Sequence, residues 1–314
     1  MEFKHIPVLL DECIQGLNIN PDGIYVDCTA GGGGHSSAIA AKLSKRGRLI
    51  ALDRDPDAVE TASERLVEFN NAKVIHRNYS ELDSVLSELE ISEVDGILMD
   101  LGVSSYQLDK ESRGFSYHAV DAPLDMRMSK TGMSAADVVN TFSEQQLANI
   151  IFEFGEEKFS RRIASNIIRA RAVSPIETTN QLADIIRESV PQKARRDKNP
   201  CKKTFQAIRI AVNGEFDHLS EGLDKAFNCL KPQGRLAVIT FHSLEDRIVK
   251  QRFAEWCKGC ICPPDFPQCI CGHKPQGKLV NRKPIEAAQS ELEKNNRSRS
   301  ARLRVIERSS DFSG

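Results

Sequence analysis

The chain has 314 residues, of which 40% are hydrophobic and 28% are charged, and its net charge is −1. No apolar run approaches the roughly 18 residues that a membrane-spanning helix needs, and residues 1–7 lack the apolar stretch of a secretion signal. We therefore expect a cytoplasmic protein with a well-buried core, built as two domains or as one domain with a large insert.

The first hundred residues alternate between strand-like and helix-like segments. The expected strands are 23–28, 48–52, 73–76 and 94–99, and the expected helices between them are 36–45, 57–69 and 80–89. Such alternation with short turns predicts a parallel sheet that is covered by helices on both faces.

The pattern changes at about residue 106. Residues 109–133 are rich in Gly, Ser, Pro and charge, which is typical of a long functional loop, and residues 134–196 are helix-like, with helix caps expected at Ser134, Ser143 and Thr178. The sheet then resumes, with helices at 216–230 and 244–256, a turn at 231–234, and strands at 235–241 and 301–307. We expect a sheet domain in two parts, 1–108 and 213–314, split by a helical substrate-recognition insert at 109–212.

A glycine-rich turn, Asp27 to Ser36, joins the first expected strand to the first helix. Glycine lets the backbone approach a ligand closely, and the amides at the helix start then face that ligand. Asp53 ends the next strand, 22 residues after Gly31, where an acid can hold a ribose hydroxyl pair. A nicotinamide dinucleotide site is the competing interpretation, but the third glycine of its fingerprint is replaced by Ser36. A flexible turn without a ligand remains a further alternative.

Several runs of sequence, in order along the chain, resemble the bacterial ribosomal RNA small-subunit methyltransferase H family. These runs are 5–10, 27–36, 53–56, 100–109, 113–116, 123–128, 205–209, 241–247 and 297–301. The resemblance implies a Rossmann-like class I methyltransferase sheet with an inserted all-helical domain. It also implies transfer of a methyl group from S-adenosylmethionine to N4 of a cytidine in the decoding region of small-subunit rRNA. The cofactor positions that it implies are Gly33, Gly34, His35, Asp53, Tyr79, Asp100 and Gln107.

The exocyclic amine of cytosine is a poor nucleophile because its lone pair is delocalised, so the enzyme must orient it and exclude water. Asp100 ends the fourth expected strand and is our first candidate for this task, although it could instead serve only the cofactor. His242 follows the fifth strand and is a second candidate, with a structural role as the alternative. The segment after Asp100 lacks the Pro-Pro-aromatic motif of many amino-methyltransferases, so Ser104 and Ser105 are also considered.

The target base must leave its stack to reach a methyl donor. Three aromatic side chains are candidate stacking partners, although a core position is the more frequent role of such residues: Phe115, Tyr117 and Phe241. The same choice applies to Tyr79, which either packs on an adenine or is a half-buried aromatic at the rim.

Two basic runs suggest an anionic partner, which we expect to be small-subunit rRNA or the small ribosomal subunit. One run, 193–209, has seven basic residues and one acid, and its lysines and arginines are expected in an exposed loop: Lys193, Arg195, Arg196, Lys198, Lys202 and Lys203. The other run has arginines that alternate as on one face of a strand: Arg297, Arg299, Arg302 and Arg304. Two solvated faces are the simpler alternative.

Five of the nine cysteines lie close together in the sequence: Cys257, Cys260, Cys262, Cys269 and Cys271, followed by His273. They offer enough soft ligands for a tetrahedral zinc ion, which would be structural because methyl transfer needs no metal. A loop of reduced surface cysteines is the alternative. Two other functions remain open for the whole chain, namely a DNA amino-methyltransferase and a ribosome assembly factor without catalytic activity.

Overall fold

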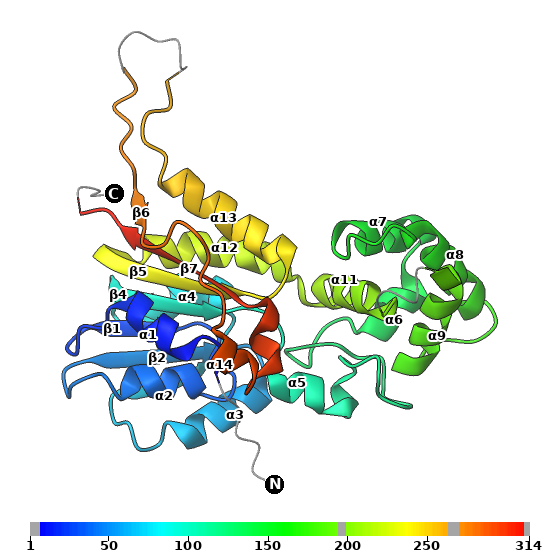
Figure 1. The fold of residues 1–314 in the computed structure, drawn as a ribbon. Coiled ribbons are helices and arrows are strands. Elements are labelled where there is room, and N and C mark those ends of the chain that lie inside the picture. Colours follow the sequence, from blue (N-terminus) through cyan, green and yellow to red (C-terminus); the bar gives the residue numbers. More distant parts are fainter. Residues whose placement is uncertain (1–6, 194–198, 263–269, 311–314) are drawn as a thin grey trace. The chain divides into compact units, whose positions relative to one another are not determined.

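The computed structural model describes residues 7–193, 199–262 and 270–310 (Figure 1). The chain forms two compact units. The sheet unit consists of Met1–Gly102 and His218–Gly314, and the helical unit is Val103–Asp217. The predicted bounds of the insert, 109 and 212, both fall inside the helical unit, which begins soon after the strand that Asp100 ends.

The sheet unit is built on seven strands in the order β3-β2-β1-β4-β5-β7-β6. Their bounds are β1 Ile24–Asp27, β2 Arg48–Asp53, β3 Ala72–His76, β4 Val94–Asp100, β5 Leu230–Thr240, β6 Gly277–Leu279 and β7 Arg302–Arg308. The five strands from β3 to β5 are parallel, and β7 is antiparallel to both of its neighbours. This order confirms the predicted α/β sheet. The chain reverses direction of winding between β1 and β4, the point at which open α/β sheets bind ligands.

Helices cover both faces of this sheet. The first face carries α1 (Leu10–Leu17), α2 (Gly34–Ala40) and α3 (Pro56–Arg65), and the second carries α4 (Leu82–Glu88), α12 (Glu215–Asn228) and α13 (Ser243–Trp256). Alternate residues of β2 supply the two cores, because Leu49 and Ala51 pack on the first face and Ile50 and Leu52 on the second. Between β6 and β7 the chain forms α14 (Gln289–Leu292) and the short 3-10 helix η3 (Asn296–Ser300).

Three details of the sheet unit differ from the sequence predictions. The turn expected at 231–234 lies inside β5, where the pairing with β4 shifts register between Val94 and Gly96 and Gln233 has a φ of 66°. The arginines of the tail do not share one strand face, since Arg297 and Arg299 lie in η3 and only Arg302 and Arg304 lie in β7. Helix α1 and the three-residue strand β6 were not predicted.

The helical unit has its own core. Its elements are α5 Ser105–Asp109, η2 Glu111–Arg113, α6 Ala135–Thr141, α7 Glu144–Glu153, α8 Ser160–Arg171, α9 Thr179–Ser189 and α11 Cys201–Asn213. The expected caps Ser134, Ser143 and Thr178 are confirmed, and each forms a capping box. The buried amide of Asn213 fixes the long loop at 109–133, because it donates to the Met126 carbonyl at 2.7 Å and accepts from the Met128 amide at 2.8 Å.

Candidate active site

The glycine turn lies between β1 and α2 and is held in one conformation. Gly31 and Gly33 have φ values of 51° and 74°, a region that side chains other than glycine rarely adopt. The Gly33 amide donates to the Ala30 carbonyl at 2.7 Å, which closes the turn. A side chain at Gly32 would meet no atom within 4 Å, so the described residues leave open space beside the turn.

Asp27, at the end of β1, holds the glycine turn through hydrogen bonds to its carboxylate. Its buried carboxylate accepts hydrogen bonds from the Ser36 hydroxyl at 2.6 Å and from the Thr29 amide at 3.1 Å. The Thr29 hydroxyl in turn accepts from the Asp100 amide at 2.6 Å, which ties the turn to the end of β4. Ser36 therefore has an internal structural partner, and this role of Asp27 was missed in the sequence.

Asp53, at the end of β2, touches the turn directly. Its carboxylate accepts from the Gly31 amide at 2.8 Å and from the Asp55 amide at 2.8 Å. Burial raises the pKa of Asp53 to about 6, although these two hydrogen bonds act in the opposite direction. The acid and the glycine turn thus meet at the carboxyl edge of the sheet, as their positions in the sequence predict.

Asp100, at the end of β4, presents an unsatisfied oxygen. Its Oδ2 atom lies 3.6 Å from His35 Nδ1, whereas its buried Oδ1 atom has no hydrogen-bond partner among the residues that the structure describes. The pKa of Asp100 is raised to about 6, mainly by burial and also by the charges of Asp27 and Glu245, while His35 acts to lower it. A buried carboxylate oxygen without a donor is costly, so this atom is suited to receive one from a ligand.

His35 and Gly34 have structural explanations of their own. The buried ring of His35 donates from Nε2 to the Val8 carbonyl at 2.9 Å, so its Nδ1 atom faces Asp100. A Cβ atom on Gly34 would lie 2.4 Å from Pro7 Cγ. The ring of His35 therefore has partners within the protein.

Tyr79 opens the short 3-10 helix η1 (Tyr79–Glu81), which follows β3. Its ring is half-buried against the second core and lies over Gly222 of α12, where a Cβ atom would come within 2.4 Å of the ring. Gly222 is also next to Met99 of β4. The ring thus lies near the carboxyl end of β4. The sequence analysis did not recognise Gly222 as the residue that leaves space for the ring.

His242 caps helix α13 and pairs with Glu245. Its Nε2 atom lies 3.0 Å from Glu245 Oε1, and the other oxygen of Glu245 accepts from the Phe241 amide at 2.8 Å. Glu245 is buried and near Gly102, directly after β4. His242 therefore serves as the cap of α13, and Glu245 is a buried acid at this edge of the sheet that the sequence analysis missed. The capping pattern His-x-x-Glu was the available signal.

The remaining candidates lie in the helical unit, except for Phe241. Ser104 and Gln107 form the capping box of α5. The Ser104 hydroxyl accepts from the backbone amide of Gln107, and the side-chain oxygen of Gln107 accepts from the backbone amide of Ser104. Phe115 is buried in the core of this unit, and Tyr117 packs edge-on against Phe205 with ring centroids 5.6 Å apart. These two aromatic residues are therefore core side chains. Phe241 is partly buried against the first core of the sheet unit.

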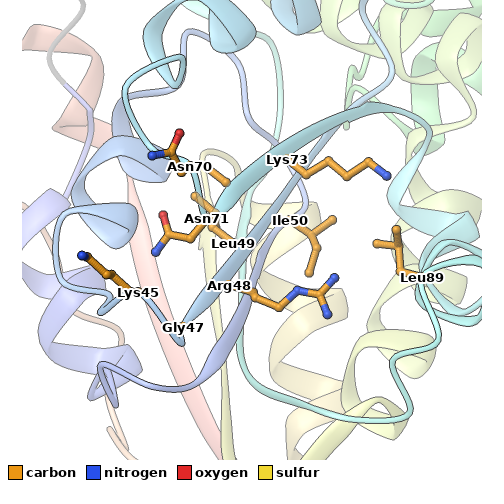
Figure 2. Close-up of a pocket in the computed structure, with 10 residues that line it drawn as sticks. Lys45, Gly47, Arg48, Leu49, Ile50, Asn70, Asn71, Lys73 and Leu89 are labelled. Atoms are coloured by element: carbon orange, nitrogen blue, oxygen red, sulfur yellow. The ribbon is translucent and has the colours of Figure 1, made fainter.

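A hollow of about 290 Å³ lies at the opposite edge of the sheet, at the beginnings of β2 and β3 (Figure 2). Its lining includes Lys45, Arg48 and Lys73. Since ligands of open α/β sheets bind at the carboxyl ends of the strands, this hollow is not the candidate site.

Comparison with known proteins identifies the family. Residues 2–309 match the model of the MraW methylase family. The chain belongs to this family. This confirms the resemblance seen in the sequence and the expectation of a methyltransferase.

The relatives match over nearly their whole length. A protein of Clostridium botulinum (strain Kyoto / Type A2) named ribosomal RNA small subunit methyltransferase H is 56% identical, over 97% of this chain and 99% of the relative. The protein of the same name from Brevibacillus brevis (strain 47 / JCM 6285 / NBRC 100599) is 53% identical, over 98% and 99%. A solved rRNA methylase from Streptococcus thermophilus is 12% identical with a TM-score of 0.42, over 96% of this chain and 93% of that structure.

Within the described ranges, no helix has the length and apolar character that crossing a membrane requires.

Proposed function

We propose that the chain transfers a methyl group from S-adenosylmethionine to N4 of a cytidine in the decoding region of small-subunit rRNA. The observation that carries the proposal is the buried Oδ1 atom of Asp100, which has no partner among the described residues and lies at the carboxyl end of β4. Family membership and the names of the relatives support the RNA substrate. Such a substrate would place the reaction in the cytoplasm.

The cofactor fits the residues at this edge of the sheet. Asp53 would hold the ribose hydroxyls, the glycine turn would let the backbone approach, and Tyr79 would pack on the adenine. The positions carried over from the family are Gly33, Gly34, His35, Asp53, Tyr79, Asp100 and Gln107. When bound, S-adenosylmethionine supplies an electrophilic methyl group on a sulfonium sulfur.

Asp100 would orient the amine of the target base. A carboxylate that accepts a hydrogen bond from the amine localises the nitrogen lone pair, and it can take the proton as the nitrogen gains its new substituent. With a pKa of about 6, Asp100 is mostly ionised at neutral pH. His242, held by Glu245, would contribute to binding the base from the end of β5.

Replacement of Gly222 by alanine tests the role of Tyr79. The added Cβ atom would lie 2.4 Å from the ring, so the ring must move. We expect about tenfold weaker binding of S-adenosylmethionine, measured by calorimetry, since base–aromatic stacking contributes roughly 1–3 kcal/mol. Gly259→Ala is the control, because its Cβ would meet only Pro275, at 3.8 Å. Unchanged affinity in Gly222→Ala would restrict Tyr79 to a packing role.

RNA would be bound by basic residues of the helical unit. Lys193, Lys202 and Lys203 are exposed, and the Lys203 ammonium donates to the Glu156 carbonyl at 2.7 Å. Lys202 and Lys203 lie in the first turn of α11 rather than in the predicted loop, and Arg195, Arg196 and Lys198 lie outside the described residues. In the tail, Arg302 and Arg304 form ion pairs with Asp246, so they are less available to bind phosphate groups of RNA.

Binding to the small subunit is therefore expected to weaken steeply with salt. Each phosphate contact contributes about 0.7–0.9 to the slope of log affinity against log salt concentration. The double variant Lys193→Ala/Lys202→Ala should lower this slope by about 1.5, whereas Lys45→Ala in the sheet unit should leave it unchanged. Binding of the wild-type protein that is indifferent to salt would reject the assignment.

Methyl transfer separates the proposal from its alternatives. Labelled S-adenosylmethionine is incubated with small subunits that lack the modification, with the free small-subunit rRNA, and with duplex DNA. We expect label in RNA with the wild-type protein, no label with Asp53→Ala, and normal labelling with the exposed control Asp22→Ala. Label in DNA alone would favour a DNA amino-methyltransferase, and binding without label would favour an assembly factor.

A further inference from the structure

Residues 257–262 lead away from α13, and residues 270–276 lead back to β6 (Figure 1). At its base, the Gln276 amide donates to the Trp256 carbonyl at 2.8 Å. The described cysteines of this segment are not in disulfides. Cys269 lies outside the described residues, and the methyl-transfer proposal assigns the segment no role.

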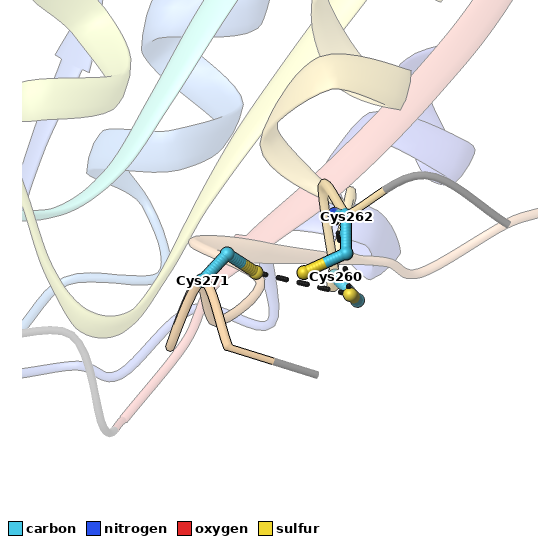
Figure 3. A group of neighbouring side chains, drawn as sticks. All are labelled: Cys260, Cys262 and Cys271. Carbon is cyan, nitrogen blue, oxygen red and sulfur yellow. Dashed lines mark hydrogen bonds between the residues drawn. The ribbon is translucent and has the colours of Figure 1, made fainter. Parts of the chain in front are cut away.

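Three sulfur atoms converge in this segment. The Sγ atoms of Cys260, Cys262 and Cys271 all lie within 4.8 Å of one another (Figure 3). The sulfurs of Cys260 and Cys271 are 3.7 Å apart. Two thiolates on a tetrahedral zinc ion, with Zn–S bonds of about 2.3 Å, are about 3.8 Å apart. A disulfide would require about 2.0 Å, so the two thiols are hydrogen-bonded rather than linked, and their spacing also matches that of two ligands of one ion.

Backbone amides point at two of these sulfurs. The Ile261 amide donates to Cys271 Sγ at 3.4 Å, and the Cys262 amide donates to Cys260 Sγ at 3.4 Å. Sulfur accepts weakly as a thiol, and amide donors around metal-bound thiolates stabilise their negative charge. The loop is therefore folded so that its own backbone supports thiolates at this point.

The structure also separates the converging cysteines from Cys257. That residue packs against the second core of the sheet unit and is not in the group of converging sulfurs. His273, two residues after Cys271, has its Nδ1 atom 2.6 Å from the Gly259 carbonyl. The ring nitrogens of His273, like the sulfur of Cys257, are not in the group of converging ligand atoms.

We propose that Cys260, Cys262 and Cys271 bind a zinc ion. Three thiolates are soft ligands of the kind that hold structural zinc ions. The segment contributes little to either core, so a metal that joins Cys260 to Cys271 would replace the missing hydrophobic packing. The site is structural and independent of the methyl-transfer proposal.

Zinc content of the full-length protein, purified under reducing conditions without chelators, tests the proposal. We expect about one zinc per chain in the wild type, and less than about a tenth of that in Cys260→Ser and Cys271→Ser. Cys257→Ser and Cys229→Ser are the matched controls and should keep the metal. Cobalt substitution should add thiolate charge-transfer absorption, which is lost with Cys262→Ser. Absence of zinc after reduction and reconstitution, or equal loss in Cys257→Ser and Cys260→Ser, would overturn the site.

His273→Gln is a further control, because the ring nitrogens of His273 are outside the group of converging ligand atoms. We expect unchanged zinc affinity in competition with a chelator. A loss of zinc as large as that in Cys260→Ser would overturn the site. Hydrogen exchange monitors folding in every variant, and removal of zinc should raise exchange at 258–262 and 270–275 while leaving α12 and β5 protected. Methyl transfer is measured separately, so failure of either proposal can be distinguished from failure of the other.

Discussion

Replacement of Asp100 by asparagine is expected to lower the methyl-transfer rate by at least about 100-fold and to stabilise the protein without its ligands. The loss of activity follows because an amide is a weaker acceptor for the amine and cannot take its proton. The gain in stability follows because the substitution removes a buried charge whose Oδ1 atom has no partner among the described residues.

The stability gain should depend on pH. The pKa of Asp100 is about 6 in the folded protein and 3.8 in the unfolded chain, so ionisation of Asp100 costs stability as pH rises through this range. We expect the Asp100→Asn substitution to add about 1 kcal/mol to the free energy of unfolding at pH 8, and about half as much at pH 5. Urea unfolding at the two pH values measures this difference.

Asp83→Asn is the control for this substitution. The Asp83 carboxylate is half exposed and lies 2.9 Å from the Lys225 ammonium. Its replacement should preserve activity and slightly lower stability. If Asp100→Asn destabilised the protein at pH 8, or kept full activity, the description of Asp100 as a buried carboxylate that accepts from the target amine would be wrong.

Affinity for S-adenosylmethionine is expected to fall about 100-fold between pH 8 and pH 5. Asp53 and Asp100 both have a pKa of about 6, raised mainly by burial. If both must be ionised to bind the cofactor, each protonation weakens binding about tenfold at pH 5. Calorimetric titration of the wild-type protein across this range measures the effect.

The same titration of Asp100→Asn assigns the partner of Asp100. A fall of about tenfold in the variant, against about 100-fold in the wild type, would mean that Asp100 binds the cofactor. A fall of about tenfold in both proteins would mean that Asp53 alone serves the cofactor and that Asp100 serves the base. Affinity that is constant from pH 8 to pH 5 would remove both carboxylates from the site.

Much of the sheet could be predicted because its signals are local. Alternating strand-like and helix-like segments located β1, β2 and β4 closely, since each strand is a short apolar run that ends in an acid. Strand β6 has only three residues and exists through its pairing with β7, so no local pattern revealed it. The register shift that lets β5 include Pro232 also depends on a neighbouring strand, β4.

The site divides in the same way. Parallel strands end at one edge of a sheet, so the meeting of Asp53 with the glycine turn followed from position alone. Three other features depend on side-chain packing: the hydrogen bond between Ser36 and Asp27, the packing of the Tyr79 ring on Gly222, and the pairing of His242 with Glu245. The spacing of five cysteines likewise could not select the three whose sulfurs converge.

Nucleoside analysis of the methylated RNA tests the central claim most directly. Small subunits that lack the modification are treated with the protein and isotopically labelled S-adenosylmethionine, and the rRNA is digested to nucleosides and analysed by mass spectrometry. The account predicts a single labelled product, N4-methylcytidine, formed by the wild-type protein and absent with Asp53→Ala. Label in any other nucleoside, or none in N4-methylcytidine, would contradict it.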